Sequence, residues 1–188
     1  MKALRFMLFG VLMSVSTVAF AQSATQKPLP QSDAEKSFAV LKSLAGSWQG
    51  PVTVTPPQAE MGAGTVMEGT LRVTSRGNAI VHEMHEAGKP DDPARYDHPV
   101  TMLYLDGERL LLTHYCDAGN RPRMVAKTSP DGKTVEFDFV DVSGSTDYGN
   151  MYHAVFTTID ANHHIEDWTY MMPGNKPVHA HMDLARAQ

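Results

Sequence analysis

The sequence is poor in cysteine and tryptophan, with one cysteine, Cys116, and two tryptophans, Trp48 and Trp168, in 188 residues. One cysteine cannot form an intramolecular disulfide, so the chain is no disulfide-stapled scaffold, and we expect either a buried or a reactive thiol. Hydrophobic residues make up 42% of the chain and charged residues 20%. This composition excludes collagen, coiled coil and long disorder, and the length fits one domain with its own core.

Positive charge is also in short supply. The chain has 16 Lys and Arg residues against 21 Asp and Glu residues, for a formal net charge of −5. If Lys2 and Arg5 are removed with the N-terminal segment described next, 14 basic residues face 21 acidic ones, a net charge of −7. Nucleic acids and anionic membrane surfaces are bound through clustered Lys and Arg, so we expect neither as a partner.

Long apolar runs are missing except at the N-terminus. Lys2 and Arg5 precede an almost unbroken apolar run from Phe6 to Val18, and Ala19-Phe20-Ala21 then offers small residues for a signal peptidase. The run is too short to span a bilayer well. The pattern predicts a cleaved signal peptide over residues 1–21 and an exported protein, periplasmic or extracellular, without a membrane span.

One helix is expected near the start of the mature chain. Residues 22–31 contain Pro28 and Pro30 and are expected to form an irregular leader to a domain over residues 32–188. Ser32-Asp33-Ala34-Glu35 is a capping box, in which the Ser32 hydroxyl and the Glu35 side chain satisfy each other's backbone amides. It predicts an amphipathic helix over residues 33–45, whose apolar face comprises Phe38, Leu41 and Leu44.

After Gly46 the hydrophobic pattern alternates, as in β-strands. Asp106-Gly107 lies between two apolar runs and is a signal for a two-residue hairpin. Short strands with short connections predict an all-β fold, an up-and-down antiparallel barrel of about ten strands with a short N-terminal helix. The expected strands are residues 47–54, 64–75, 79–87, 99–105, 108–116, 121–128, 133–142, 151–159, 163–172 and 177–186.

Two connections are long, residues 88–98 and residues 143–150. Long loops on a barrel either guard its mouth or run over its surface, and the sequence leaves both alternatives open.

Gly46-Ser47-Trp48, between the helix and the first strand, resembles the Gly-x-Trp signature of lipocalins and their calycin relatives. The resemblance implies that Trp48 closes one end of the barrel and that Arg186, from the last strand, packs across it. Residues 102–116, with Asn120, Pro122 and Arg123 after them, resemble a bacterial family of secreted lipocalin-like proteins of unknown function. That likeness implies the fold and no chemistry.

A more distant resemblance is to nitrobindin-like barrels, which hold haem through a histidine near the C-terminus. Pro177-Val178-His179-Ala180-His181-Met182 lies at a comparable place, and the likeness implies His181 as the ligand. His179 and His181 face the same way on a strand, and imidazole binds haem iron and transition metals. A metal- or haem-binding barrel that uses these two residues, with His82 and Met84, is therefore the second hypothesis. The cofactor itself is left unknown.

The first hypothesis is non-covalent binding of a small apolar or amphiphilic molecule inside the barrel. Aromatic and Met side chains would supply apolar contacts, and a few polar groups would orient the ligand. The predicted lining residues are Met102, Tyr104, His114, Tyr115, Arg123 and Trp168.

An enzyme is the third hypothesis. His114 and Cys116 share one face of a strand, where a base could activate a thiol. Glu83 and Glu166 could form an acid–base pair. The sequence contains no Gly-x-Ser-x-Gly motif or other signature of a nucleophilic triad.

Overall fold

The computed structural model describes residues 30–58, 64–90, 92, 94–128 and 132–187. The predicted signal peptide and nearly all of the predicted leader lie outside this part. No helix in the described residues is long and apolar enough to cross a bilayer.

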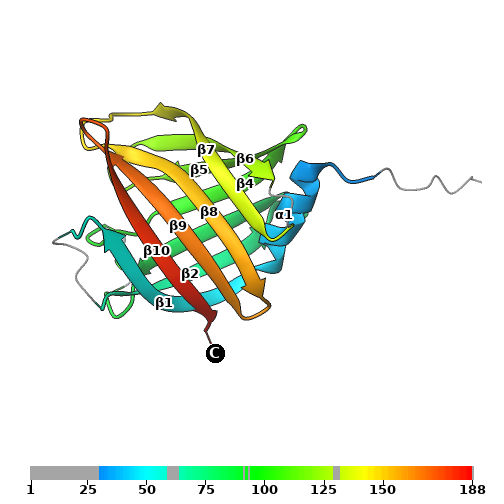
Figure 1. Ribbon diagram of the computed structural model, residues 1–188, viewed down its shortest axis with the longest axis horizontal. Helices are drawn as coiled ribbons and strands as arrows, with labels where there is room; N and C mark the ends of the chain where they lie inside the picture. Colours follow the sequence, from blue (N-terminus) through cyan, green and yellow to red (C-terminus); the bar gives the residue numbers. More distant parts are fainter. Residues whose placement is uncertain (1–29, 59–63, 91, 93, 129–131, 188) are drawn as a thin grey trace, which may run out of the picture. The chain divides into compact units, whose positions relative to one another are not determined.

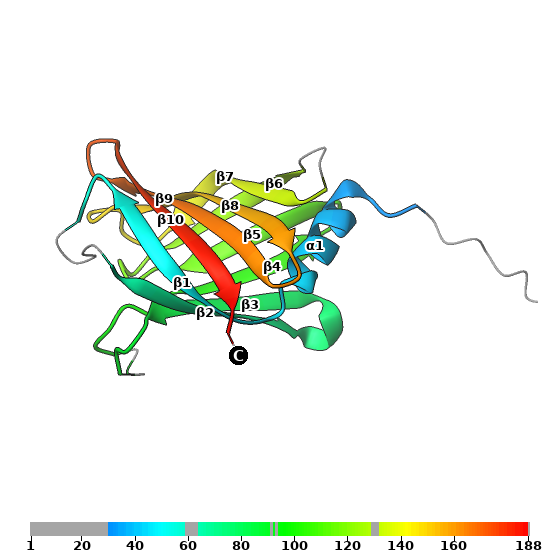
Figure 2. The same ribbon diagram turned by 60° about the horizontal axis from the view of Figure 1, so that its bottom comes forward.

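The described chain is a closed antiparallel barrel of ten strands preceded by one helix (Figures 1 and 2). Each strand pairs with its neighbour in the sequence, and the last strand pairs with the first to close the barrel. The predicted fold class is therefore confirmed. The elements are α1 (Asp33–Ser43), β1 (Gly46–Thr55), β2 (Val66–Thr74), β3 (Ala79–Glu86), β4 (Val100–Asp106), β5 (Arg109–Tyr115), β6 (Arg121–Thr128), β7 (Thr134–Ser143), β8 (Asn150–Asp160), β9 (His163–Met172) and β10 (Lys176–Arg186), with a 3-10 turn, η1 (Ser75–Gly77), between β2 and β3.

Local sequence explains the helix and the β4–β5 hairpin. The capping box forms as predicted, because the Glu35 amide donates to the Ser32 hydroxyl (3.2 Å) and the Ser32 amide donates to the Glu35 carboxylate (2.7 Å). Asp106 pairs with Arg109 across the hairpin, and Gly107 takes the positive φ of 61° that the turn needs. The helix ends at Ser43, two residues earlier than predicted.

The helix lies against one end of the barrel (Figure 1). Its buried residues Phe38 and Leu41 join a cluster of inward-facing side chains in the same half of the barrel. Close packing of these side chains fills this end, so we call it the closed end. The cluster includes Trp48, Leu71, Ile80, Leu103, Leu110, Leu112, Met124, Phe137, Phe156 and Leu184.

Trp48 and Arg186 cover the closed end together. The Trp48 indole is 1% exposed and donates to the Leu44 carbonyl at 2.8 Å. The Arg186 guanidinium lies 4.2 Å from the centroid of that ring and donates to the carbonyls of Ala45 and Ala161, both at 3.0 Å. This is the arrangement that the lipocalin resemblance implies.

Gly46 is required by the same contact. Its φ is +145°, and a Cβ at this position would lie 2.2 Å from Arg186 Nη1. A side chain would therefore push the guanidinium off the Trp48 ring, which explains glycine at the first position of the Gly-x-Trp motif.

Replacing Gly46→Ala should lower the free energy of unfolding by about 2 kcal/mol or more, through backbone strain and displacement of Arg186. Gly107→Ala is the matched control, since its φ is also positive but its Cβ would meet open space. We expect it to cost only about 1 kcal/mol. Urea denaturation of both variants measures the difference, and equal losses would contradict the proposed contact.

Candidate functional site

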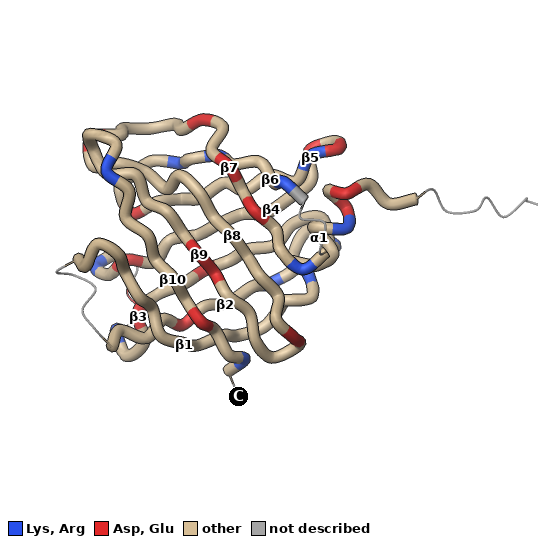
Figure 3. Tube along the Cα trace, viewed as in Figure 1, with Lys and Arg blue, Asp and Glu red and all other residues tan. Residues whose placement is uncertain are grey.

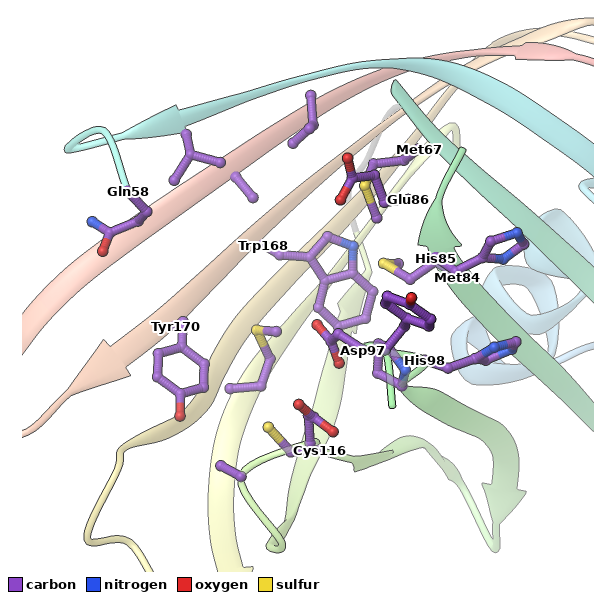
Figure 4. A pocket seen from close by; sticks show the side chains of 18 of the residues that line it. Gln58, Met67, Met84, His85, Glu86, Asp97, His98, Cys116, Trp168 and Tyr170 are labelled. Carbon is purple, nitrogen blue, oxygen red and sulfur yellow. The ribbon is translucent and has the colours of Figure 1, made fainter. Parts of the chain in front are cut away.

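The end of the barrel away from α1, which we call the open end, contains a cavity of about 570 Å³. This volume falls in the roughly 300–1,000 Å³ range of small-molecule sites. Inward-facing residues of β1, β2, β3, β5, β8, β9 and β10 line it, and residues of the β3–β4 loop and Tyr148 border its mouth. Figure 4 shows Trp168 projecting into this space.

Methionine dominates the apolar lining. Five methionines contribute, accompanied by Val52, Val54, Val178 and Ala180. The thioether side chain is flexible and polarisable, so such a surface adapts to apolar ligands of different shapes. The methionines are Met67, Met84, Met151, Met172 and Met182.

Residues of both long loops line the mouth of the cavity. The β3–β4 loop contributes Tyr96, Asp97 and His98 to the lining, and the β7–β8 loop contributes Tyr148. Buried Asn120 holds the second loop, because its amide donates to the carbonyls of Ser145 and Gly149, both at 2.7 Å. The Tyr170 hydroxyl also donates to the Tyr148 carbonyl at 2.9 Å.

A buried polar cluster lies between the cavity and the closed end. Its centre is Glu166 on β9, which is fully buried. The Trp168 indole donates to one carboxylate oxygen at 2.9 Å, and His164 Nε2 lies 3.0 Å from the other. His82 Nε2, from β3 on the opposite wall, lies 3.4 Å from that second oxygen.

Ring contacts extend the cluster towards both ends of the barrel. The His164 ring meets Trp48 edge-on at 4.2 Å between centroids, which connects the cluster to the closed end. On the other side, the His82 ring stacks on Trp168 at 6.1 Å. Trp168 thus presents its ring to the cavity while its N–H is held by the carboxylate beneath.

Charge in this cluster resides on Glu166. Burial alone would raise the pKa of its carboxyl, but nearby His82 and the hydrogen bonds from His164 and Trp168 together lower it. Burial lowers the pKa of His82, against the attraction of Glu166. His82 Nδ1 and His164 Nδ1 are both buried with no hydrogen-bond partner among the described residues.

His114 forms the polar part of the cavity floor. It is 2% exposed, and its Nδ1 lies 2.8 Å from the hydroxyl of buried Thr101. Burial, with a smaller contribution from His82, lowers its pKa from 6.5 to about 3, so the ring is neutral. The ring lines the cavity, so a bound molecule would lie against it.

Cys116 lines the mouth but has no activated thiolate. Burial raises the pKa of its thiol, and the nearby carboxylates of Asp97 and Asp117 raise it further, against hydrogen bonds from the backbone of residues 117 and 118. Neutral His114 supplies no positive charge to stabilise a thiolate. Glu83 and Glu166 do not meet either, since Glu83 faces outward on β3 and Glu166 faces inward on β9.

The sequence-predicted lining residues divide between the two faces of the barrel wall. His114 and Trp168 lie at the cavity. The expectation that the other four face the interior is wrong, because alternation along β4, β5 and β6 directs Leu103, His114 and Met124 inward and the residues next to them outward. The outward-facing residues are Met102, Tyr104, Tyr115 and Arg123.

Outer-face partners explain these orientations. The Tyr104 hydroxyl lies 3.1 Å from the Thr113 hydroxyl, and Tyr115 is 49% exposed. Arg123 forms a bidentate ion pair with Asp141 on the neighbouring strand β7. Figure 3 shows Lys and Arg positions dispersed around the barrel.

The four residues of the metal- or haem-binding hypothesis do not lie together in the structure. His179 and His181 lie on the outer face of β10, bonded to Thr169 (3.0 Å) and Asp167 (2.6 Å) of β9. His82 and Met84 face the interior, so the barrel wall separates the two pairs.

Another set of ligand-type side chains does meet on the outer wall. Among the described residues, one group of three lies close enough to share a cation, namely Glu136, Asp138 and His153. Asp138 in this group already forms an ion pair with Lys127.

Sequence reasoning missed most of the residues that shape the cavity. Alternation along β9 does place Glu166 on the same face as Trp168, which is a usable signal. The approach of His82 to Glu166 has no local signal, because β3 and β9 are not adjacent in the barrel.

Neither a family model nor a curated protein matches the chain. Among solved structures, the chain is similar to a protein of unknown function of the DUF3598 family from Nostoc punctiforme. The two share 7% sequence identity over 80% of this chain and 99% of the other, with a TM-score of 0.24. At this score the likeness says nothing about the site.

The neutral imidazole of His114 predicts acid sensitivity. Its pKa of about 3 in the folded state lies below the 6.5 of the unfolded chain, so on acidification the unfolded chain binds the proton first. The stability is therefore present above pH 6.5 and is lost as the pH falls towards 3. Between pH 7.5 and pH 5, His114 alone should cost about 2 kcal/mol.

Urea unfolding at both pH values checks this prediction. His114→Gln keeps a polar side chain but does not titrate, so it should reduce the pH dependence by about 2 kcal/mol. The control His181→Gln removes an exposed histidine of the outer face. A pH dependence that is unchanged in His114→Gln would contradict the buried, neutral state of this residue.

Proposed function

We propose that this protein is an exported, lipocalin-like binding protein that holds a small apolar or amphiphilic molecule in the cavity at the open end of its barrel. The observation that carries the proposal is the cavity itself, of about 570 Å³, lined by five methionines and floored by Trp168 and His114. Export rests on the signal-peptide pattern of residues 1–21.

The composition of the lining supports non-covalent binding, in which apolar contacts supply most of the ligand's affinity. Methionine, valine and alanine side chains line much of the cavity, and polar groups such as His114 at the floor and Asp97 at the mouth accompany them. This is the usual composition of small-molecule sites, where a few polar groups fix the ligand's orientation. Trp168 is anchored through its N–H to Glu166, so the floor is formed before a ligand arrives.

An apolar fluorescent dye tests the proposal. N-phenyl-1-naphthylamine should bind with a rise in its fluorescence and with one site per chain. Ala180→Phe should weaken this binding by roughly tenfold or more, because Ala180 lines the cavity and a phenyl ring there would occupy the ligand's space.

The matched control is Ala185→Phe, at an exposed, outward-facing position of the same strand. Its dye affinity should equal that of the unmodified protein, and circular dichroism should show that both variants are folded. The proposal fails if the dye does not bind, or if both substitutions weaken binding equally.

A further inference from the structure

The mouth of the cavity carries an excess of negative charge. Four carboxylates line it, and Lys89 is the only Lys or Arg among the described lining residues. The carboxylates belong to Glu86, Asp92, Asp97 and Asp117.

Two of these carboxylates already have partners. Glu86 lies 3.8 Å from Lys89 Nζ, and Asp92 accepts a hydrogen bond from the Ala94 amide at 3.2 Å. Within the described part of the chain, Asp97 and Asp117 have neither a Lys nor an Arg partner. A backbone amide is neutral, so Asp92 keeps its charge, and the excess negative charge at the mouth comes from Asp92, Asp97 and Asp117.

Asp97 and Asp117 interact with each other. Partial burial raises the pKa of Asp97, and the charge of Asp117 raises it further, while His98 acts in the opposite direction. Their charges also act on Cys116 and Tyr170, so the four groups occupy one region of the mouth, and burial with these neighbours raises the pKa of Tyr170 to about 12. Figure 4 shows Asp97, Cys116 and Tyr170 around the entrance to the space in front of Trp168.

Aromatic rings accompany the unpaired carboxylates. Tyr96, Tyr148 and Tyr170 line the mouth, and Trp168 lies deeper. Aromatic faces attract cations, and carboxylates add Coulombic attraction, so this combination favours an ammonium group over an anion. His85, which also lines the mouth, lies 3.2 Å from the Glu68 carboxylate and so already has an anionic partner.

The floor of the same cavity contains a buried imidazole. His114 is 2% exposed and lines the cavity, and its Nδ1 lies 2.8 Å from the Thr101 hydroxyl. The acidic mouth and this floor therefore belong to one elongated site.

We propose that the natural ligand is a cationic amphiphile, whose amine or quaternary ammonium group lies between Asp97 and Asp117 and whose apolar body extends along the methionines towards Trp168. The inference rests on the proposed function and adds the chemical class of the ligand. An ammonium group at the mouth offsets the repulsion between the two carboxylates, which an anionic headgroup would increase.

Competition against bound N-phenyl-1-naphthylamine tests the charge preference. Decyltrimethylammonium and decyl sulfate carry the same chain with opposite charges, and both are added below their micelle-forming concentrations at about 0.15 M salt, where distant surface charges are screened. The cation should displace the dye at a roughly tenfold lower concentration than the anion.

Variants that remove single negative charges test whether Asp97 and Asp117 cause the preference for the cation. Asp97→Asn and Asp117→Asn should each weaken binding of the cation by about three- to fivefold, and the double variant should remove most of the preference. Glu108→Gln removes the same charge from an exposed position in the β4–β5 hairpin, at the helix end of the barrel, and should leave the preference unchanged. Dye affinity itself should be the same in all four variants, because the dye is neutral.

Each outcome decides something different. If the dye binds but the anion competes as well as the cation, the cationic ligand is excluded while the proposed binding function stands. A cation preference that survives in the double variant would refute the placement at Asp97 and Asp117. If the dye does not bind at all, the proposed function fails, and this inference fails with it.

Discussion

The buried carboxylate of Glu166 is the constraint around which the barrel interior is arranged. An ionised group with no exposed surface is costly unless donors surround it, and here Trp168, His164 and His82 do so from two walls of the barrel. Those partners occupy positions that aliphatic side chains would fill in a solid core. The layer lies between the side chains packed against α1 and the cavity.

The two ends of the barrel differ in what covers them. At the closed end, Trp48 and Arg186 lie across the opening, and Phe38 and Leu41 of α1 complete a densely packed cluster. At the open end, loops replace the helix, and Asn120 holds one of them through two backbone carbonyls. Rigid walls with loops at the mouth are suited to binding, because the scaffold supplies stability and the loops supply contacts.

Much of the fold was predictable, because it depends on local patterns. The capping box at Ser32, the turn at Asp106-Gly107 and the alternation of each strand are all short-range signals, and they gave one helix and ten strands. The Trp48–Arg186 contact joins residues far apart in the chain, and the sequence alone did not suggest it. It was expected only from the resemblance to lipocalins.

The site was less predictable, because it depends on which face of each strand turns inward. Tyr115 and His114 are neighbours on one strand, so both cannot line the interior, and the structure buries His114 and exposes Tyr115. For Arg123, the deciding partner is Asp141 on another strand. Pairing between distant strands also brings His82 to Glu166, and no spacing within one segment encodes it.

The central claim is that the open half of the barrel is hollow and accepts one molecule. Native mass spectrometry of the intact chain, recorded after incubation with N-phenyl-1-naphthylamine, tests it most directly. The account predicts a single adduct per chain that disappears when the protein is denatured. An unmodified polypeptide mass at saturating dye would contradict it, since the cavity would then be closed to ligands.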